Sequence, residues 1–385
     1  MNSDLIGIIP AAGRGTRMAR LTSELPKALI EIEGRTLIER AIESLKSVGV
    51  SKIVVVTGYR GDMVRDFVRA RDFAVEIDFA LQERQLGLAH AIASASDQIT
   101  SDFVVLCPDN IYTDPRDLQE ATRCFLANKP PFLMVATVNP THQRDRAKYF
   151  SSALQNVAPH VYEDHSIREH QHGLAMTSTG CTFFAREALR RLPSFDNLTV
   201  EHKFDAYLSQ LAENDHPLIY LLRGMRYDFS EPADVSSYMA LQEQLRNTTG
   251  QGVSAILMNA DDRVLLQRRD DNPNIRYPGH WALFGGSIED HESPYAAVRR
   301  EILEETGYNV ENLGLFREFV QNNKREFAFV GEINASLAEL SLNEGQGMDF
   351  VSPAELRKLL IRPDDNETLK AYFGEWDDGN RAIRS

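Results

Sequence analysis

GSIEDHESPYAAVRREILEETGY, residues Gly286–Tyr308, is the stretch that says most about the fold. Ser293 and Pro294 suit the N-cap and first position of a helix, and Gly307 suits the left-handed position just past its end. Between these limits, apolar residues recur at helical spacing and predict a stripe that packs into a domain: Tyr295, Val298 and Ile302. The stretch therefore predicts a loop followed by a helix with one buried face.

The same helix carries three glutamates on one face, because they stand at positions i, i+3 and i+4: Glu301, Glu304 and Glu305. Carboxylates this close repel one another unless cations lie between them. The alternative is a solvated charged face, but such faces usually pair Glu with Lys four residues later, and Glu301 lacks that partner. We therefore predict that the helix binds a divalent metal.

The spacing satisfies G-x5-E-x7-R-E-U-x-E-E-x-G-U, where U is bulky and apolar and Tyr308 is the loose fit, so the stretch resembles the Nudix box. The resemblance covers residues 252–362 and implies an α+β Nudix-fold pyrophosphohydrolase. It implies that the three glutamates bind Mg²⁺, with Mn²⁺ as the alternative, and that metal-activated water cleaves an NDP-linked compound. It also implies supporting roles, with one cation orienting a glutamate and one acid steadying the loop: Gly286, Glu292 and Arg300. Nothing in the box specifies the substrate.

Upstream of this box, Arg246–Gly252 (RNTTGQG) is polar and contains glycine, which is typical of a linker. Beyond it, Val253–Leu257 and Val264–Gln267 flank a turn and predict a hairpin that opens the C-terminal domain. Trp281 and Phe284 either stack on a base or pack in the core, and core packing is the favoured role. The expected organisation is two domains, 1–245 and 253–385, joined by a linker at 246–252.

The N-terminal part alternates short β-branched runs with helical patterns. Residues 37–48 are apolar at helical period, and Gly49 follows as a candidate C-cap. Strands that alternate with helices predict an α/β domain with a mostly parallel sheet, in which ligands gather beyond the carboxyl ends of the strands. The predicted strands are Leu5–Ile9, Lys52–Val56, Phe103–Leu106 and Phe132–Val138.

A glycine-rich turn, Ala11–Arg17 (AAGRGTR), follows the first of these strands. Gly13 and Gly15 let the backbone approach a phosphate closely, so that N–H groups donate to its oxygens. Arg17 and Lys27 bring positive charge to the same region. By itself such a turn is found equally often as a purely structural feature.

The longer stretch GRGTRMARLTSELPKAL, residues 13–29, resembles the signature of the sugar-phosphate nucleotidyltransferases, and the resemblance extends over residues 5–245. It implies a Rossmann-like (GT-A-type) fold and transfer of a nucleotidyl group from an NTP to a sugar 1-phosphate, giving NDP-X and pyrophosphate. By this resemblance Arg17 and Lys27 act on the phosphates during catalysis. The nucleotide-binding residues that it implies are Ala11, Gly13, Gly15, Thr16, Gln82 and Gly87.

Two aspartates resemble the metal carboxylates of that family. Asp109 lies in Cys107–Asn110 (CPDN), and Asp228 lies in Tyr227–Val235 (YDFSEPADV). Asp109 is either a Mg²⁺ ligand or a helix N-cap, and the ligand role is favoured because Mg²⁺ that bridges substrate phosphates needs only one or two carboxylates.

One departure concerns the acceptor. Family members carry an EKP-like lysine there, whereas Tyr162–Gly173 (YEDHSIREHQHG) has Arg168 and no lysine. Gly34–Tyr59 is equally similar to the phosphocholine cytidylyltransferase branch, so a phosphocholine-like phosphomonoester is the alternative acceptor. The same loop has three histidines that form either a metal cluster or, more commonly in proteins, a solvated loop: His165, His170 and His172.

Composition limits the partners. With 56 Asp and Glu against 42 Lys and Arg, the net charge of -14 disfavours nucleic acid. Three cysteines without metal-ligand spacing favour a reducing cytoplasm, and a basic signal segment and apolar runs of membrane-spanning length are not expected. The expected partners are small: an NTP, a phosphomonoester and an NDP-linked substrate.

A competing hypothesis makes one domain, most naturally the N-terminal one, a catalytically silent nucleotide sensor that regulates the other. The sequence leaves open the nucleobase, the acceptor, the Nudix substrate and whether the chain forms a homo-oligomer.

Overall fold

The computed structural model describes residues 4–18, 22, 24–139, 149–150, 154–158, 160–164, 174–195, 204–212 and 216–374. Its contacts divide the chain into two compact units. The first consists of Met1–Ala136, Ser178–Tyr220 and Arg226–Ala240, and the second of Thr137–Thr177, Leu221–Met225 and Leu241–Ser385. The second unit thus contains short segments that lie far upstream of residue 245 in the sequence. The domain boundary expected at 246–252 stays a prediction.

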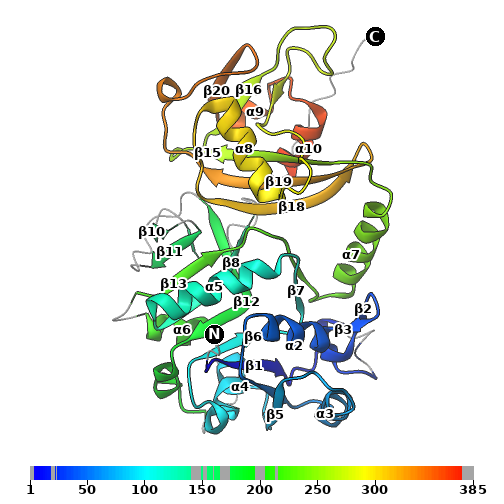
Figure 1. Cartoon of the computed structure of the whole chain (residues 1–385), viewed down its shortest axis with the longest axis vertical. Coiled ribbons are helices and arrows are strands. Elements are labelled where there is room, and N and C mark those ends of the chain that lie inside the picture. Colours follow the sequence, from blue (N-terminus) through cyan, green and yellow to red (C-terminus); the bar gives the residue numbers. More distant parts are fainter. Residues whose placement is uncertain are drawn as a thin grey trace. The chain divides into compact units, whose positions relative to one another are not determined.

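A mixed sheet with a parallel centre forms the first unit (Figure 1). Seven strands of this ten-stranded sheet follow the order β13-β8-β12-β6-β1-β4-β5. Strand β1 pairs in parallel with β4 and with β6, β4 pairs in parallel with β5, and β12 runs antiparallel to β6. The bounds are β1 Ile6–Ala11, β4 Lys52–Thr57, β5 Glu76–Leu81, β6 Phe103–Leu106, β8 Phe132–Val138, β12 Ala175–Phe184 and β13 Leu218–Leu221. The predicted α/β class and the four predicted strands are confirmed.

Helices connect these strands and begin where the sequence offers caps. Helix α2 (Leu37–Ser47) starts with a capping box, in which the Thr36 hydroxyl accepts from the Glu39 amide and the Glu39 carboxylate accepts from the Thr36 amide. Helix α5 (Pro115–Asn128) has proline at its first turn, after an Asp114 cap. The other helices are α3 Gly61–Arg69, α4 Leu88–Ser94 and α6 Phe204–Leu211, with 3₁₀ turns at η1 Thr16–Met18, η2 Lys27–Leu29, η3 Ser96–Gln98 and η6 Arg186–Arg191.

The first unit also contains two small two-stranded sheets. One pairs β2 (Glu31–Ile32) with β3 (Arg35–Thr36), and the other pairs β7 (Asn110–Tyr112) with β14 (Arg226–Asp228). The second of these brings together segments more than a hundred residues apart in sequence. Helix α7 (Pro232–Leu245) follows β14.

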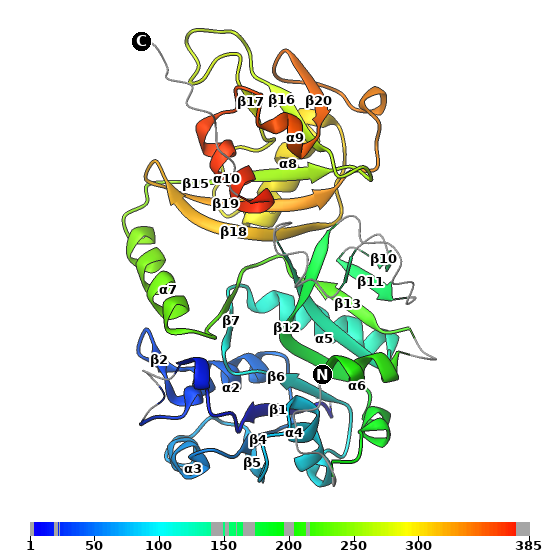
Figure 2. The ribbon, with the colours of Figure 1, turned by 180° about the vertical axis from the view of Figure 1, so that it is seen from behind.

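A second sheet, in the order β17-β16-β15-β19-β18 with β20 beside β16, forms the centre of the second unit. Helices α8 and α10 cover its opposite faces (Figures 1 and 2). The predicted hairpin is confirmed as β15 and β16, although β15 already begins at Gln251, inside the expected linker. The bounds are β15 Gln251–Met258, β16 Val264–Arg268, β17 Trp281–Ala282, α8 Pro294–Thr306, β18 Leu313–Gln321, β19 Lys324–Glu332, η7 Leu337–Glu339, β20 Gly347–Val351, α9 Pro353–Leu356 and α10 Pro363–Phe373.

Helix α8 has the predicted limits. The Ser293 hydroxyl accepts from the Ala296 amide at 3.1 Å, Pro294 opens the helix, and Gly307 takes the left-handed conformation at φ 68°. Val298 and Ile302 are fully buried in the core of this unit, with Tyr295 and Phe284 packed in the same cluster. The predicted apolar stripe is confirmed, and Phe284 is a core residue.

Upstream segments also belong to the second unit. They form β9 (Tyr149–Phe150), β10 (Leu154–Ala158) and β11 (Val161–Asp164). Buried His160 pairs through Nε2 with the Tyr295 hydroxyl on α8, and its backbone amide donates to Asn312 Oδ1 at 3.0 Å. A Cβ on Gly314 would lie 2.1 Å from Val138 Cγ2, so the Val138 side chain packs directly against the β18 backbone at Gly314. No helix among the described residues is long and apolar enough to cross a membrane.

Candidate functional sites

A cleft of about 540 Å³ lies at the carboxyl ends of β1 and β6 in the first unit. Parallel strands end at the same edge of a sheet, so the loops that follow them converge there. Nearly all the residues implied by the N-terminal resemblance line this cleft: Ala11, Gly13, Gly15, Thr16, Arg17, Lys27, Gln82, Gly87 and Asp109. The fold therefore gathers residues that are almost a hundred positions apart.

The glycine-rich turn needs glycine at one position. Gly15 has φ +60°, and a Cβ there would lie 3.1 Å from the Lys27 Cβ and 3.2 Å from the Thr22 Cγ2. At Gly13, by contrast, a Cβ would meet nothing within 4 Å. Gly15 is thus favoured by its left-handed backbone conformation and has close neighbours, whereas Gly13 leaves open space in the cleft.

Lys27 and Asp109 form an ion pair in this cleft. The Lys27 Nζ lies 2.6 Å from Asp109 Oδ2, and the two side chains are 17% and 25% exposed. Partial burial strengthens such a pair relative to an exposed one. A cation and an acid expected at the reacting phosphates are therefore already held together by the protein.

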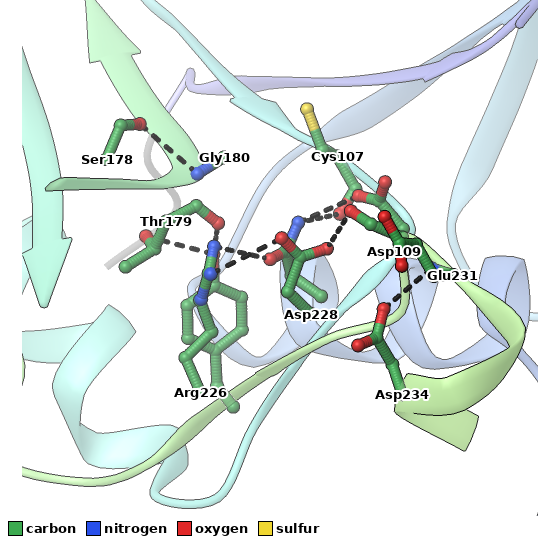
Figure 3. A network of polar contacts seen from close by, with 12 residues as sticks. Cys107, Asp109, Ser178, Thr179, Gly180, Arg226, Asp228, Glu231 and Asp234 are labelled. Carbon is green, nitrogen blue, oxygen red and sulfur yellow. Dashed lines mark hydrogen bonds and ion pairs between the residues drawn. The ribbon is translucent and has the colours of Figure 1, made fainter. Parts of the chain in front are cut away.

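The small β7–β14 sheet brings Asp228 close to Asp109 (Figure 3). It stands directly opposite Asn110, and the next amide, from fully buried Phe229, donates to the Asp109 carbonyl at 2.9 Å. The Ser230 hydroxyl, which lines the cleft, donates to Asp228 Oδ1 at 2.8 Å. Buried Phe229 thus anchors a segment that places two carboxylates side by side.

Arg226 supports the same arrangement. It donates to Asn110 Oδ1 at 3.0 Å and lies 3.4 Å from Asp228 Oδ2. Burial, followed by the nearby Asp109 carboxylate, raises the pKa of the Cys107 thiol, so Cys107 stays a neutral thiol beside these charges. Neither Arg226 nor Asn110 was singled out from the sequence, because their role depends on a pairing between distant strands.

Gln82 and Gly87 lie together in the lining of the same cleft. The buried Gln82 amide donates to the Gly87 carbonyl at 3.0 Å and contacts His90 Nδ1 at 3.1 Å. Gly87, at φ 93°, caps the start of α4. The Gln82 amide nitrogen is therefore engaged with the protein, and Gln82 positions the Gly87 loop.

In the second unit, Arg300 binds the acids of its own helix and loop. It donates twice to Glu292, at 3.1 and 3.0 Å, and once each to Glu301 at 2.9 Å and Glu304 at 3.1 Å. A fifth bond reaches the Ser287 carbonyl at 3.0 Å. The Arg300 hydrogen bonds, foremost among its causes, lower the pKa of Glu292. Arg300 thus ties the loop to two of the three glutamates.

Glu305 is held differently. It is buried, and it accepts hydrogen bonds from Gln267 Nε2 at 3.0 Å and from the Gly285 amide at 3.1 Å. Burial raises its pKa to about 7, against the opposing effect of these two hydrogen bonds. A Cβ on Gly286 would lie 2.4 Å from Glu301 Oε1, so the Glu301 carboxylate packs directly against the backbone of this loop.

Comparison with known families matches both parts of the chain. Residues 6–149 match the nucleotidyl transferase family, and residues 248–372 match the NUDIX domain. The chain carries a nucleotidyl transferase domain and a NUDIX domain. Both are families of enzymes, and the two resemblances read from the sequence are confirmed.

Curated relatives match the nucleotidyl transferase domain. The UTP--glucose-1-phosphate uridylyltransferase AglF of Haloferax volcanii is 35% identical over 105 residues, which cover 27% of this chain and 43% of that protein. The Bifunctional protein GlmU of Methanococcus maripaludis is 38% identical over 110 residues, covering 29% of this chain and 26% of GlmU. The chain therefore spans less than half the length of these relatives.

Solved structures show the same fold. A UDP-glucose pyrophosphorylase in complex with UDP-glucose superposes with a TM-score of 0.52 at 19% identity, over 61% of this chain and 98% of that one. A UTP-bound UGPase from Acinetobacter baumannii gives a TM-score of 0.51 at 17% identity, over 63% of this chain and 94% of that one. The GT-A-type fold is confirmed for the nucleotidyl transferase domain.

Metal binding can be tested against the side chains present. Among the described residues, no three His, Cys, Asp or Glu side chains already form a metal-binding group. In the nucleotidyl transferase domain, adjacent Asp109 and Asp228 nevertheless fit Mg²⁺, which takes oxygen ligands and needs few protein carboxylates beside substrate phosphates. In the NUDIX domain, Arg300 binds Glu301 and Glu304, and Gln267 binds Glu305. The ligands that these three glutamates offer are all carboxylate oxygens, which fit the same ion.

The remaining predicted features lie elsewhere. Arg168 and the three histidines at 165, 170 and 172 are outside the described residues. Gln267, which the sequence alone did not single out, holds Glu305 from β16, and its only sequence signal is a polar residue directly after the apolar run Val264–Leu266.

Proposed function

We propose that the nucleotidyl transferase domain transfers a nucleotidyl group from an NTP to a sugar 1-phosphate or related phosphomonoester, releasing pyrophosphate. The observation that carries this proposal is the Lys27–Asp109 pair at 2.6 Å, set among the glycine-rich turn and the Gln82–Gly87 segment in one cleft. This cleft combines a cation, an acid and a backbone that a phosphate can approach closely, and it is large enough for a nucleotide.

Each part of the cleft has a task in this reaction. The glycine-rich turn, with open space beside Gly13, would hold phosphate oxygens through its backbone N–H groups. Lys27 would stabilise the negative charge that grows on the α-phosphate as pyrophosphate leaves. Asp109 and Asp228 would hold Mg²⁺, which when bound neutralises phosphate charge. The ion pair keeps Lys27 ordered at the position where that charge develops.

The test is to incubate the protein with each NTP and a panel of sugar 1-phosphates and phosphocholine, while following pyrophosphate and NDP-X. Asp109→Asn and Asp228→Asn should each remove Mg²⁺-dependent transfer while leaving hydrolysis by the NUDIX domain intact. Release of pyrophosphate by either variant at the normal rate, with its normal Mg²⁺ dependence, would remove that aspartate from the site.

We infer that the NUDIX domain hydrolyses a nucleoside diphosphate-linked compound. The Glu301–Glu304–Glu305 face would hold the metal ion, whose chemistry when bound is to activate water and neutralise the diphosphate. Arg300 would keep Glu301 and Glu304 oriented, while Glu292 anchors Arg300 from the loop. Gln267 fixes the third carboxylate.

This second activity is measured on a panel of NTPs and NDP-sugars across a Mg²⁺ titration. Release of nucleoside monophosphate that depends on Mg²⁺ is expected. Binding of these compounds without any turnover would instead favour a silent nucleotide-binding domain.

A further inference from the structure

A cavity of about 330 Å³ lies in the second unit next to the Nudix box. Its lining includes Gly285 and Gly286, the same backbone that touches the glutamates: the Gly285 amide binds Glu305, and a Cβ on Gly286 would meet Glu301. A molecule in this cavity therefore adjoins the residues proposed to act on the diphosphate.

The floor of the cavity is a row of side chains across the sheet. Glu326 on β19 stands opposite Gly252 on β15 and opposite Phe319 on β18. Cross-strand partners point to the same face, so the carboxylate and the ring lie side by side. Gly252 leaves space for that carboxylate, because a Cβ there would lie 2.4 Å from Glu326 Oε2. A small side chain on β15 thus lets an acid lie along the floor.

Glu326 has no committed partner there. No hydrogen bond to its carboxylate is formed within the described part of the chain, and only longer-range charges act on it, from Lys324 and Arg362 among others. Burial raises the pKa of Glu326. A half-buried carboxylate is costly to leave without donors, so the site favours a ligand that donates N–H groups.

Three other lining side chains have unsatisfied atoms. Gln321 Oε1, Arg269 Nε and Arg362 Nε are buried without a hydrogen-bond partner. Small rotations of these side chains toward a ligand would therefore gain hydrogen bonds without breaking any at those atoms. The set offers acceptors and donors together, as the edge of a nucleobase requires.

One common base matches an acceptor carboxylate best. Guanine presents N1–H and N2–H as adjacent donors, which a carboxylate accepts in a bidentate pair, while its O6 and N7 accept from arginine. Adenine, cytosine and uracil lack two adjacent ring-edge donors of this kind. Phe319 and Tyr277 supply apolar surface beside the edge-reading groups, and exposed Arg276 adds positive charge at the rim.

We propose that this cavity binds the base of the NUDIX substrate and selects guanine, with Glu326 as the residue that reads the guanine edge. This inference rests on the proposed function, because it takes the bound nucleotide to be the substrate of the NUDIX domain. Base selection is a property of binding, however, and can be tested separately from turnover.

The experiment is isothermal titration of the full-length Glu304→Gln protein, which suppresses turnover, with GDP, IDP, ADP, CDP and UDP. IDP differs from GDP only in lacking the 2-amino group. GDP is expected to bind at least about tenfold more tightly than IDP and the other three. Adding Glu326→Gln should reduce GDP binding to the level of IDP, and any nucleotide held elsewhere in the chain will be unaffected by this change.

The matched control is Glu311→Gln, at an exposed acid outside the cavity, which should leave the GDP preference unchanged. Equal affinity for all five diphosphates, or a GDP preference that survives Glu326→Gln in a protein with an unchanged melting temperature, would overturn the proposal. Selective GDP binding without hydrolysis by the wild-type protein would keep the guanine site and reject the proposed activity. Hydrolysis without base preference would do the reverse.

Discussion

The two candidate sites are built in opposite ways. The NUDIX site is concentrated in one stretch, where a loop and one helix supply Glu292, Arg300 and all three glutamates. The nucleotidyl transferase cleft is assembled from separate segments of the chain, and its aspartates meet only because β7 pairs with β14. In the continuous motif, the spacing of residues along one helix determines which side chains lie together. In the assembled cleft, the topology of the sheet determines this.

The largest expected effect tests the assembled cleft. Lys27→Ala removes the cation paired with Asp109, and transferase turnover should fall by roughly a hundredfold to a thousandfold, as for loss of one group that stabilises transition-state charge. NUDIX hydrolysis should not change. Pyrophosphate release gives the rate, and Lys46→Ala, at an i,i+3 surface pair, is the control. Near-normal transfer by the Lys27 variant would mean that the cleft is not the site of chemistry.

The second prediction tests the continuous motif. Glu304→Gln keeps size and helix propensity but removes one charge from the glutamate face, so hydrolysis should fall by roughly tenfold to a hundredfold. Transferase activity should stay the same. The readouts are a Mg²⁺ titration of hydrolysis and melting curves with and without the metal. If neither the activity nor the metal-induced melting shift changes, Glu304 does not bind the metal.

The third prediction concerns the close contact between Gly285, just before the Nudix box, and strand β15. Gly285 has φ +146°, and a Cβ there would lie 2.1 Å from the Val253 carbonyl oxygen, so Gly285→Ala should destabilise the second unit by about 2 kcal/mol. Gly347→Ala is the control, because nothing lies within 4 Å of the added Cβ. Urea unfolding followed by tryptophan fluorescence measures both, since Trp281 and Trp376 lie in this part of the sequence. Equal stability of the two variants would contradict the tight contact.

The smallest effect concerns the upstream segments of the second unit. Burial lowers the pKa of His160 to about 3, below the 6.5 of an ordinary histidine, so folded His160 stays neutral while the unfolded chain takes up a proton. Its contribution is complete above pH 6.5 and is lost as the pH falls from 6.5 toward 3. At pH 5.5 the loss should be roughly 1 kcal/mol relative to pH 7.5.

Urea unfolding of the wild type and of His160→Gln at these two pH values checks this. The variant should lose less stability on acidification, by that same amount, whereas exposed His291→Gln should behave like the wild type. An identical pH dependence in wild type and His160→Gln would show that His160 is not buried in its neutral form.

Much of the NUDIX domain could be predicted because its signals are local. Ser293, Pro294 and Gly307 mark the ends of α8 through the backbone conformations that they favour, and helical periodicity places the glutamates on one face. The four strands of the N-terminal part could be predicted for a similar reason, since strands buried on both faces are nearly continuous apolar runs.

Only the tertiary structure decided which distant residues meet. Local sequence contains no signal that Asp228 would stand opposite Asn110, that Gln267 would hold Glu305, or that Gly252 would make room for Glu326. Nor did it indicate that His160 belongs with α8. Each of these contacts joins elements far apart in the chain, and their pairing is selected by burial of whole sheet and helix faces instead of by the preferences of neighbouring residues.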